Sequence, residues 1–250
     1  MPLRVAGDRR HAEALIHELH PDLCIVCGWY WLLRKEILES VPGGFIGIHY
    51  SLLPKYRGGA PLVWALINGE PEVGLSIFTF AEGVDSGPIW AQERIPVGPD
   101  DYISDVLERL EAKSIAALEA TYPGILNGTT RPWEQEHTQA TYCSMRQPSD
   151  GEIHWRAPAR EVYNFIRAQS RPYPGTFTWL QGEKLVIWRA RREESVYYGT
   201  PGQVSKVSAD GVHVVCGDNR AVVIETVEQD GIEMKAHKAL KSVSIRLLKP

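Results

Sequence analysis

The sequence predicts a mixed α/β domain followed by a smaller antiparallel β domain. Up to about residue 130, helical patterns alternate with short apolar runs, as in a mainly parallel sheet that helices cover on both faces. Beyond that point the runs are turn-separated and rich in Val, Ile, Thr and aromatic residues, which is typical of a small barrel or sandwich. We therefore expect an α/β domain at 1–130, a polar linker at 131–147 and a β domain at 148–250.

Composition places the 250-residue chain among soluble globular proteins, with 44% apolar and 23% charged residues. The first 150 residues hold 12 Lys+Arg against 20 Asp+Glu, a net charge of −8, and the remaining 100 hold 15 against 11, a net charge of +4. A total of −4 gives no general attraction to nucleic acid. No apolar run has membrane-spanning length and the N-terminus does not look like a signal peptide, so we expect a cytoplasmic protein without membrane contact.

The elements of the first domain follow from apolar spacing. Residues 11–20 place Ala12, Leu15, Ile16 and Leu19 on one helical face. Pro123–Gly124 should end the longest helical pattern. Residues 2–7 offer at most a short edge strand. The further helices are expected at 34–41, 60–69 and 101–122, and the strands at 22–28, 44–49, 73–80 and 89–97.

The second domain begins with an amphipathic helix at 157–169, where Val162, Phe165 and Ile166 share one side. The rigid turn "SRPYPG" follows it. The strands are expected at 176–180, 184–190, 202–208, 211–216 and 221–227.

Two cysteines, Cys24 and Cys27, form a CxxC pattern that invites a redox or zinc interpretation. They lie in an apolar strand-like run, where residues three apart point to opposite faces, and no second Cys pair completes a metal set. We favour buried strand cysteines and expect no metal.

One histidine and one aspartate follow neighbouring strands. Gly47 and His49 share a face at the carboxyl end of the strand at 44–49, the end at which ligands bind in open α/β sheets. Asp85 lies in the glycine-flanked loop after the next strand. A lone His at a strand end is more often structural, but a pair of these side chains would suit acyl or proton transfer, with the carboxylate orienting the ring and favouring its charged form.

At this point the chain resembles a known family. "IHYSLLPKYRGGAPLVWALINGEPEVGLSIFTFAEGVDSGPIWAQ" is similar to the core of the folate-dependent formyltransferases. "DGEIHWRAPAREVYNFIRAQSRPYPGTFTWLQGEKLVIW" is similar to the C-terminal domain that some members carry. The resemblance implies a Rossmann-like first domain, a β-barrel-like second domain, and an enzyme that moves a formyl group from 10-formyltetrahydrofolate to a primary amine.

The resemblance also implies roles for single residues. His49 matches the catalytic His, which donates to the oxyanion that forms when the amine attacks the formyl carbon, and Asp85 matches the Asp that orients it. Lys55 and Arg57, in the loop after His49, are candidates to contact the phosphate or carboxylates of a ligand, and a plain structural role in the loop is an equal alternative. The folate would lie against the following residues on two loops: Trp29, Trp31, Leu32, Leu33, Ala81, Glu82 and Val84.

The family's Asn two residues before the catalytic His is replaced here by Gly47. Losing one oxyanion donor typically costs about 10²–10³ in kcat. Three interpretations stay open: a slow or inactive enzyme, a replacement donor such as a water, Ser51 or Asn68, or a related transfer reaction.

The family also has about 50–60 further residues before the matched region, an estimate that fits domain sizes. Their absence would leave an apolar sheet edge that a homodimer could cover. The acceptor we expect is a nucleotide-linked amino sugar, with a hydroxyornithine-type siderophore precursor or methionyl-tRNA as alternatives. A non-catalytic module that binds folate or nucleotide is the competing class.

Overall fold

The computed structural model describes residues 3–248 as two compact units, each built from separate stretches of chain. The first unit holds the residues up to Pro61 together with Glu72–Ile95 and Arg109–Met145. The second unit holds Leu62–Pro71, Pro96–Glu108 and the chain from Arg146 onward. These units follow spatial contacts and not chain order, so the domain boundaries at 130 and 148 stay a prediction.

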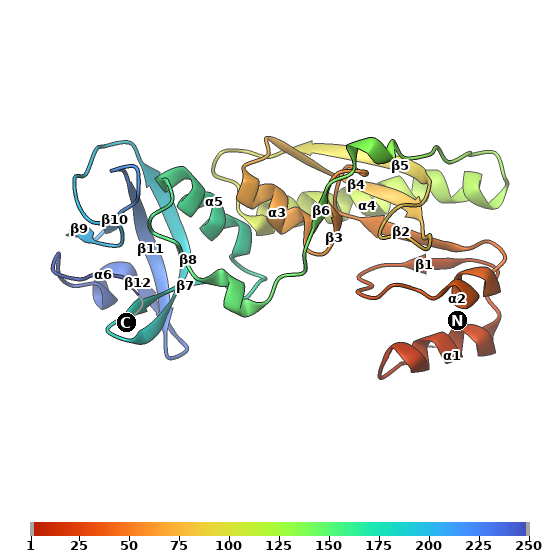
Figure 1. The fold of residues 1–250 in the computed structure, drawn as a ribbon, viewed down its shortest axis with the longest axis horizontal. Helices are drawn as coiled ribbons and strands as arrows, with labels where there is room; N and C mark the ends of the chain where they lie inside the picture. The colour runs from red at the N-terminus through yellow and green to blue at the C-terminus, as the bar shows by residue number, and fades with distance from the viewer. Residues whose placement is uncertain (1–2, 249–250) are drawn as a thin grey trace. The chain divides into compact units, whose positions relative to one another are not determined.

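The first unit is built on a four-stranded sheet of order β1-β2-β4-β5 (Figure 1). β1 and β2 are parallel, with Cys24 opposite Phe45, whereas β2 and β4 are antiparallel, with His49 opposite Ser76. The α/β fold class is confirmed, and the sheet mixes parallel with antiparallel pairing. The four strands are β1 (Cys24–Val26), β2 (Phe45–His49), β4 (Glu72–Thr79) and β5 (Ile89–Pro96).

Helix α1 (Arg9–Leu19) lies against α2 (Lys35–Ser40) and begins at Asp8, whose carboxylate accepts from the His11 N–H at 2.9 Å. The apolar face predicted for 11–20 is only partly buried, and Leu19 is exposed. The buried residue of α1 is Glu13, and hydrogen bonds from Arg9 at 2.8 Å and Arg34 at 2.6 Å lower the pKa of its carboxyl group. Periodicity alone did not indicate this ion pair.

Helix α3 (Pro61–Asn68) begins at a proline and is followed by Gly69, as expected. The long helix α4 (Ile103–Leu126) instead continues through Pro123, so the predicted stop at Pro123–Gly124 is wrong. A proline forfeits one hydrogen bond and keeps a helical φ, and here the helix ends one turn later. Residues 3–7 form no strand.

The second unit contains a six-stranded antiparallel sheet of order β7-β8-β11-β10-β9, with β12 paired to β11 (Figure 1). Helix α5 (Ala159–Gln169) packs on β8 and buries Val162, Tyr163 and Ile166. β12 and the short helix α6 (Ala236–Ala239) were not predicted. The strands are β7 (Thr176–Leu180), β8 (Glu183–Glu193), β9 (Val204–Ser208), β10 (Gly211–Val215), β11 (Ala221–Gln229) and β12 (Ile232–Lys235).

Tyr102 holds the segment before α4 to this sheet. Its hydroxyl donates to the Ala190 carbonyl at 2.7 Å and accepts from the Ala190 N–H at 2.9 Å, next to a shift of register between β8 and β11. Tyr102→Phe would leave both backbone groups unpaired, so we expect the free energy of unfolding to fall by about 1–3 kcal/mol. Urea unfolding measures this, and Tyr198→Phe, at an exposed tyrosine, is the matched control. Equal unfolding midpoints for the two variants would contradict the assignment.

Two short strands and two short 3₁₀ helices complete the chain. β3 (Arg57–Gly58) pairs in parallel with β6 (Tyr142–Cys143). Along the chain, η1 (His137–Gln139) precedes β6 and η2 (Pro148–Gly151) follows it.

In residues 3–248 we find no helix long and apolar enough to cross a membrane.

Candidate functional site

The predicted pair is brought together at one end of the first unit's sheet. Nδ1 of His49, the last residue of β2, lies 3.7 Å from Oδ2 of Asp85, which follows β4. The His49 side chain is 10% exposed and the Asp85 side chain 21%, so the pair is largely enclosed but reachable. This separation is too long for a hydrogen bond and suits an ion pair when the ring is protonated.

The second ring nitrogen of His49 is already engaged. Nε2 lies 2.8 Å from the carbonyl oxygen of Tyr56. A carbonyl oxygen only accepts, so Nε2 carries the hydrogen and the neutral ring presents the lone pair of Nδ1 toward Asp85. Nδ1 is therefore the nitrogen that is available for proton transfer.

Asp85 is held in an unusual backbone conformation, with φ of +44°. Its Oδ2 accepts from the Gly58 N–H at 2.7 Å, and its carbonyl accepts from the Gln135 side chain at 2.8 Å. Gly58 has φ of +100°, and a Cβ there would overlap the carbonyl oxygen of Cys143. Glycine is thus required where the N–H that holds the carboxylate approaches β6.

Aromatic rings fill the space into which a side chain at residue 47 would extend. A Cβ at this residue would overlap Cε1 of Phe80 and lie 3.0 Å from Cε1 of Phe78. The two phenylalanine rings are stacked with centroids 5.3 Å apart, and the Phe78 ring meets the His49 ring edge to face at 6.1 Å. The Phe80 ring lies where a side chain of residue 47 would begin, so the interpretation that a water replaces the missing donor there gains no support.

The predicted folate loop presents aromatic and apolar side chains to solvent. Tyr30, Trp31 and Leu32 are exposed, while Leu33 is buried in a cluster with Ile37 and anchors the loop. Such exposure of large apolar groups marks a binding surface.

Trp29 and Phe80 are partly buried and pack against the same apolar cluster. Trp29 meets Trp31 edge to face, with ring centroids 5.2 Å apart. Nε1 of Trp29 is buried without an acceptor in the part of the chain that the structure describes. An orphaned donor beside exposed apolar side chains fits a flat, hydrogen-bonding ring such as a pterin.

The opposite predicted wall, Ala81–Asp85, is also partly open. Glu82 and Val84 are exposed and Ala81 is half-buried. Nζ of Lys35 lies 3.5 Å from Oε1 of Glu82, so this exposed ion pair joins the loop to the first residue of α2. The two loops predicted to hold the folate thus lie near one another.

Four further residues were predicted either as replacement donors (Ser51 and Asn68) or as ligand contacts (Lys55 and Arg57). Ser51 is buried and its hydroxyl donates to the Lys55 carbonyl at 2.7 Å, so it closes its own loop and is not presented as a replacement donor. The Lys55 side chain is exposed and fits a ligand contact. Arg57 is 3% exposed and is bound by Gln135, so it has a structural place, and its predicted contact with substrate gains no support.

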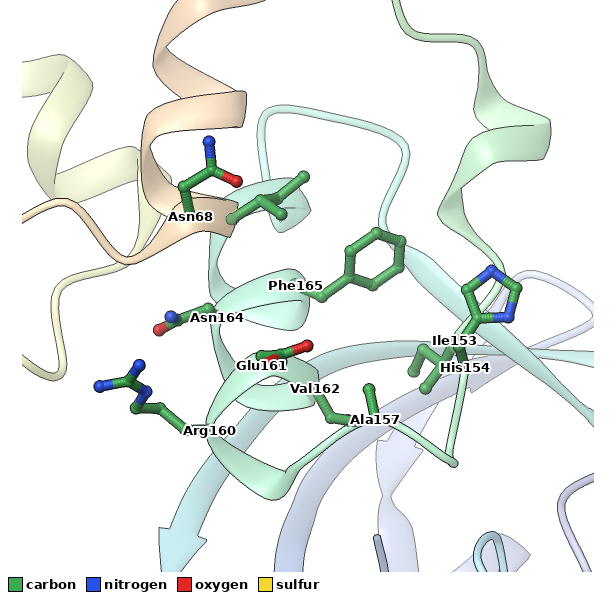
Figure 2. Close-up of a pocket in the computed structure, with 10 residues that line it drawn as sticks. Asn68, Ile153, His154, Ala157, Arg160, Glu161, Val162, Asn164 and Phe165 are labelled. Carbon is green, nitrogen blue, oxygen red and sulfur yellow. The ribbon is translucent and has the colours of Figure 1, made fainter. Parts of the chain in front are cut away.

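Asn68 ends α3 and belongs to the second unit, where it borders a cavity of about 370 Å³ (Figure 2). Phe165 and Val162 of α5 supply apolar walls of this cavity, and Asn164 lies on the same helix (Figure 2). None of the predicted catalytic or folate-contacting residues lines it. The lining residues are Ile67, Asn68, Ile153, His154, Ala157, Arg160, Glu161, Val162, Asn164 and Phe165.

The prediction that both CxxC cysteines are buried is wrong. Cys24 is half-buried at the start of β1, and Cys27 is exposed beyond the end of that short strand. In residues 3–248 no group of three or more His, Cys, Asp or Glu side chains is arranged to hold a metal ion.

Three residues of the site were missed from the sequence: Tyr56, Phe80 and Gln135. Tyr56 contributes only its carbonyl oxygen, which no side-chain pattern reveals. Phe80 lies two residues after Phe78, which is paired with Gly47, so strand periodicity is the signal that could have placed it on the face of Gly47. Gln135 lies in the segment that we predicted to be a linker.

Two family models match the chain. The model described as formyl transferase matches residues 6–121, and the model described as formyl transferase, C-terminal domain, matches residues 146–244. The two matched ranges together take in most of the sequence.

Solved structures share the fold at low identity. HypX from Aquifex aeolicus, in complex with tetrahydrofolic acid, is 20% identical with a TM-score of 0.70 over 91% of this chain and 40% of that one. An N-formyltransferase from Helicobacter canadensis, in complex with folinic acid and dTDP-3-aminofucose, is 17% identical with a TM-score of 0.63. The match covers 80% of this chain and 72% of that one. Methionyl-tRNA formyltransferase from Clostridium thermocellum is 23% identical with a TM-score of 0.60. The match covers 73% of this chain and 78% of that one. The chain spans about two fifths of the HypX chain.

Proposed function

Because this chain belongs to the formyl transferase family, we propose that it transfers a formyl group from 10-formyltetrahydrofolate to a primary amine. The observation that carries the proposal is the enclosed pair of His49 and Asp85 within the range that the family model matches. The exposed apolar loop with its orphaned Trp29 N–H supports the folate as donor.

The folate supplies the formyl carbon, and the chain supplies proton transfer and orientation. Nδ1 of His49 acts on the reacting groups, either by accepting the proton that the amine loses or by donating to the formyl oxygen. Oδ2 of Asp85, 3.7 Å away, stabilises the ring when it is protonated. The Tyr56 carbonyl fixes the ring by accepting from Nε2.

A second donor to the formyl oxygen is not offered by residue 47, because glycine has no side chain and the Phe80 ring lies beside it. A reaction that depends on one side-chain donor is expected to be slow relative to an enzyme with two.

We propose a nucleotide-linked amino sugar as the acceptor. The Helicobacter canadensis relative, which shares the fold, was solved with dTDP-3-aminofucose, and exposed Lys55 in the loop after His49 offers a cation to a diphosphate. Cytoplasmic location and a homodimer remain our expectations, and methionyl-tRNA and a hydroxyornithine-type precursor remain alternative acceptors.

A formylation assay tests both parts of the proposal. The protein is incubated with 10-formyltetrahydrofolate and, separately, with dTDP-amino sugars, hydroxyornithine and methionyl-tRNA, and mass spectrometry detects the formylated product. We expect product from one class of acceptor, with release of tetrahydrofolate in equal amount.

Quenching of tryptophan fluorescence by 5-formyltetrahydrofolate separates binding from turnover, because Trp29 and Trp31 lie in the proposed folate loop. Folate binding without product from any acceptor would favour a binding module. Absence of both binding and product would overturn the proposed function.

A further inference from the structure

The residues from Trp133 to Met145, called here the return segment, bind the start of β5 at one end and the loop that follows β2 at the other. At one end Trp133 and Ile89 exchange two backbone hydrogen bonds, of 2.8 and 2.9 Å. At the other end β6 pairs with β3, and the Gly59 N–H donates to the Cys143 carbonyl at 3.0 Å. A segment predicted as a linker is thus hydrogen-bonded to the first unit at both ends.

Gln135 is the centre of this segment's contacts. The residue is 5% exposed, and its Nε2 donates to the carbonyl oxygens of Asp85 and Gly87 at 2.8 and 2.7 Å. Its Oε1 accepts from Nε and Nη2 of Arg57 at 3.1 and 2.6 Å. A guanidinium only donates, so the amide has one possible orientation, with both N–H groups toward the Asp85 loop.

The same segment holds the other acceptor that faces His49. The Tyr56 N–H donates to Oγ1 of Thr141 at 2.8 Å, and the Arg57 N–H donates to the Thr141 carbonyl at 2.9 Å. Tyr56 has φ of +58°. These contacts support the peptide whose carbonyl accepts from His49.

The loop of Asp85 needs such support. A non-glycine residue at φ of +44° is in a sparsely populated conformation, which persists when neighbouring groups hold it. The Gln135 side chain donates to both carbonyls that flank Ser86, those of Asp85 and Gly87. Its two hydrogen bonds hold the backbone of this loop, and together with the Gly58 N–H on Oδ2 they fix where the Asp85 carboxylate lies relative to Nδ1 of His49.

We propose that Gln135 is a positioning residue for the His49–Asp85 pair, and that the return segment is part of the active site. The kinetic part of this inference rests on the proposed function. Gln135 does not touch the reacting groups and acts through Asp85, so its loss should lower kcat far more than it raises KM for the folate, whose other proposed contacts lie at Trp29–Leu33.

Gln135→Ala and Gln135→Glu test the inference. The glutamate keeps the side-chain length and an acceptor for Arg57 while removing both N–H donors, so it stands in if the alanine variant fails to fold. Gln139→Ala is the matched control, because Gln139 is an exposed residue of the same segment. We expect kcat to fall about 10–100-fold with both Gln135 variants, as for a displaced catalytic group, and KM for the folate to change by less than about threefold.

A readout independent of turnover separates this inference from the proposed function. The imidazole ¹⁵N and Hε1 signals of His49, followed by NMR in folded protein, are expected to shift in the Gln135 variants and not in Gln139→Ala. These signals decide the role of Gln135 even if the wild-type protein transfers no formyl group. Unchanged His49 signals, or an unchanged kcat in an active protein, would overturn it.

Discussion

His49→Ala is expected to reduce kcat for formyl transfer by about 10²–10⁴-fold, the usual contribution of a positioned acid or base. The variant removes Nδ1, the ring nitrogen that faces Asp85, and leaves the Asp85 carboxylate without its ion-pair partner. Steady-state kinetics with the acceptor found in the formylation assay measures the effect. Folate binding should persist, because the ring does not belong to the loop at Trp29–Leu33.

The stability of this variant should change little. His49 contributes one hydrogen bond to the Tyr56 carbonyl, so its loss is expected to lower the free energy of unfolding by about 1 kcal/mol. His49→Gln adds a control, since its amide can still donate but cannot take up a proton at neutral pH. His17→Ala, at an exposed histidine of α1, should be as active as the wild type. Full turnover in folded His49→Ala would show that another group moves the proton.

Gly47→Asn is expected to destabilise the protein and not to raise its activity, although it restores the residue that the family resemblance leads us to expect. Any Cβ at residue 47 overlaps the Phe80 ring, and overpacking of this kind typically lowers the free energy of unfolding by about 1–3 kcal/mol. With the ring in place, the new amide lacks room to take up the donor position. Thermal unfolding and kcat, measured together, test both parts.

Gly47→Asn combined with Phe80→Ala should behave differently. Removing the ring gives the asparagine amide room to face the formyl oxygen, and a restored donor is worth up to about 10²–10³ in kcat. We therefore expect the double variant to be faster than Phe80→Ala alone, with the two substitutions strongly non-additive in both stability and rate.

The single Phe80→Ala variant is the necessary reference for this comparison. It removes the stacking on Phe78 and part of the apolar cluster near Trp29, so it should be less stable than the wild type. A gain in activity from Gly47→Asn alone, without loss of stability, would show that Phe80 does not limit residue 47. Equal rates for the double variant and Phe80→Ala would show that an amide at this position is not used.

Sequence reasoning found most helices and strands and both members of the candidate pair. Apolar runs of periods 2 and 3.6 are written directly in the chain, and the ends of β2 and β4 therefore located His49 and Asp85. It failed where long-range contacts overrule local preference. α4 continues past Pro123, and α1 buries Glu13, which is held by Arg9 and Arg34.

The sequence by itself determined the fold class, the strand ends that carry His49 and Asp85, and the absence of a side chain at residue 47. Only the tertiary structure decided what surrounds them. Phe80 fills the space beside Gly47, the Tyr56 carbonyl selects the protonated ring nitrogen, and Gln135 holds the Asp85 loop from about 50 residues away in the chain. The physical reason is that local spacing encodes which face a side chain takes, whereas hydrogen-bond partners and close packing depend on segments that meet only in the folded chain.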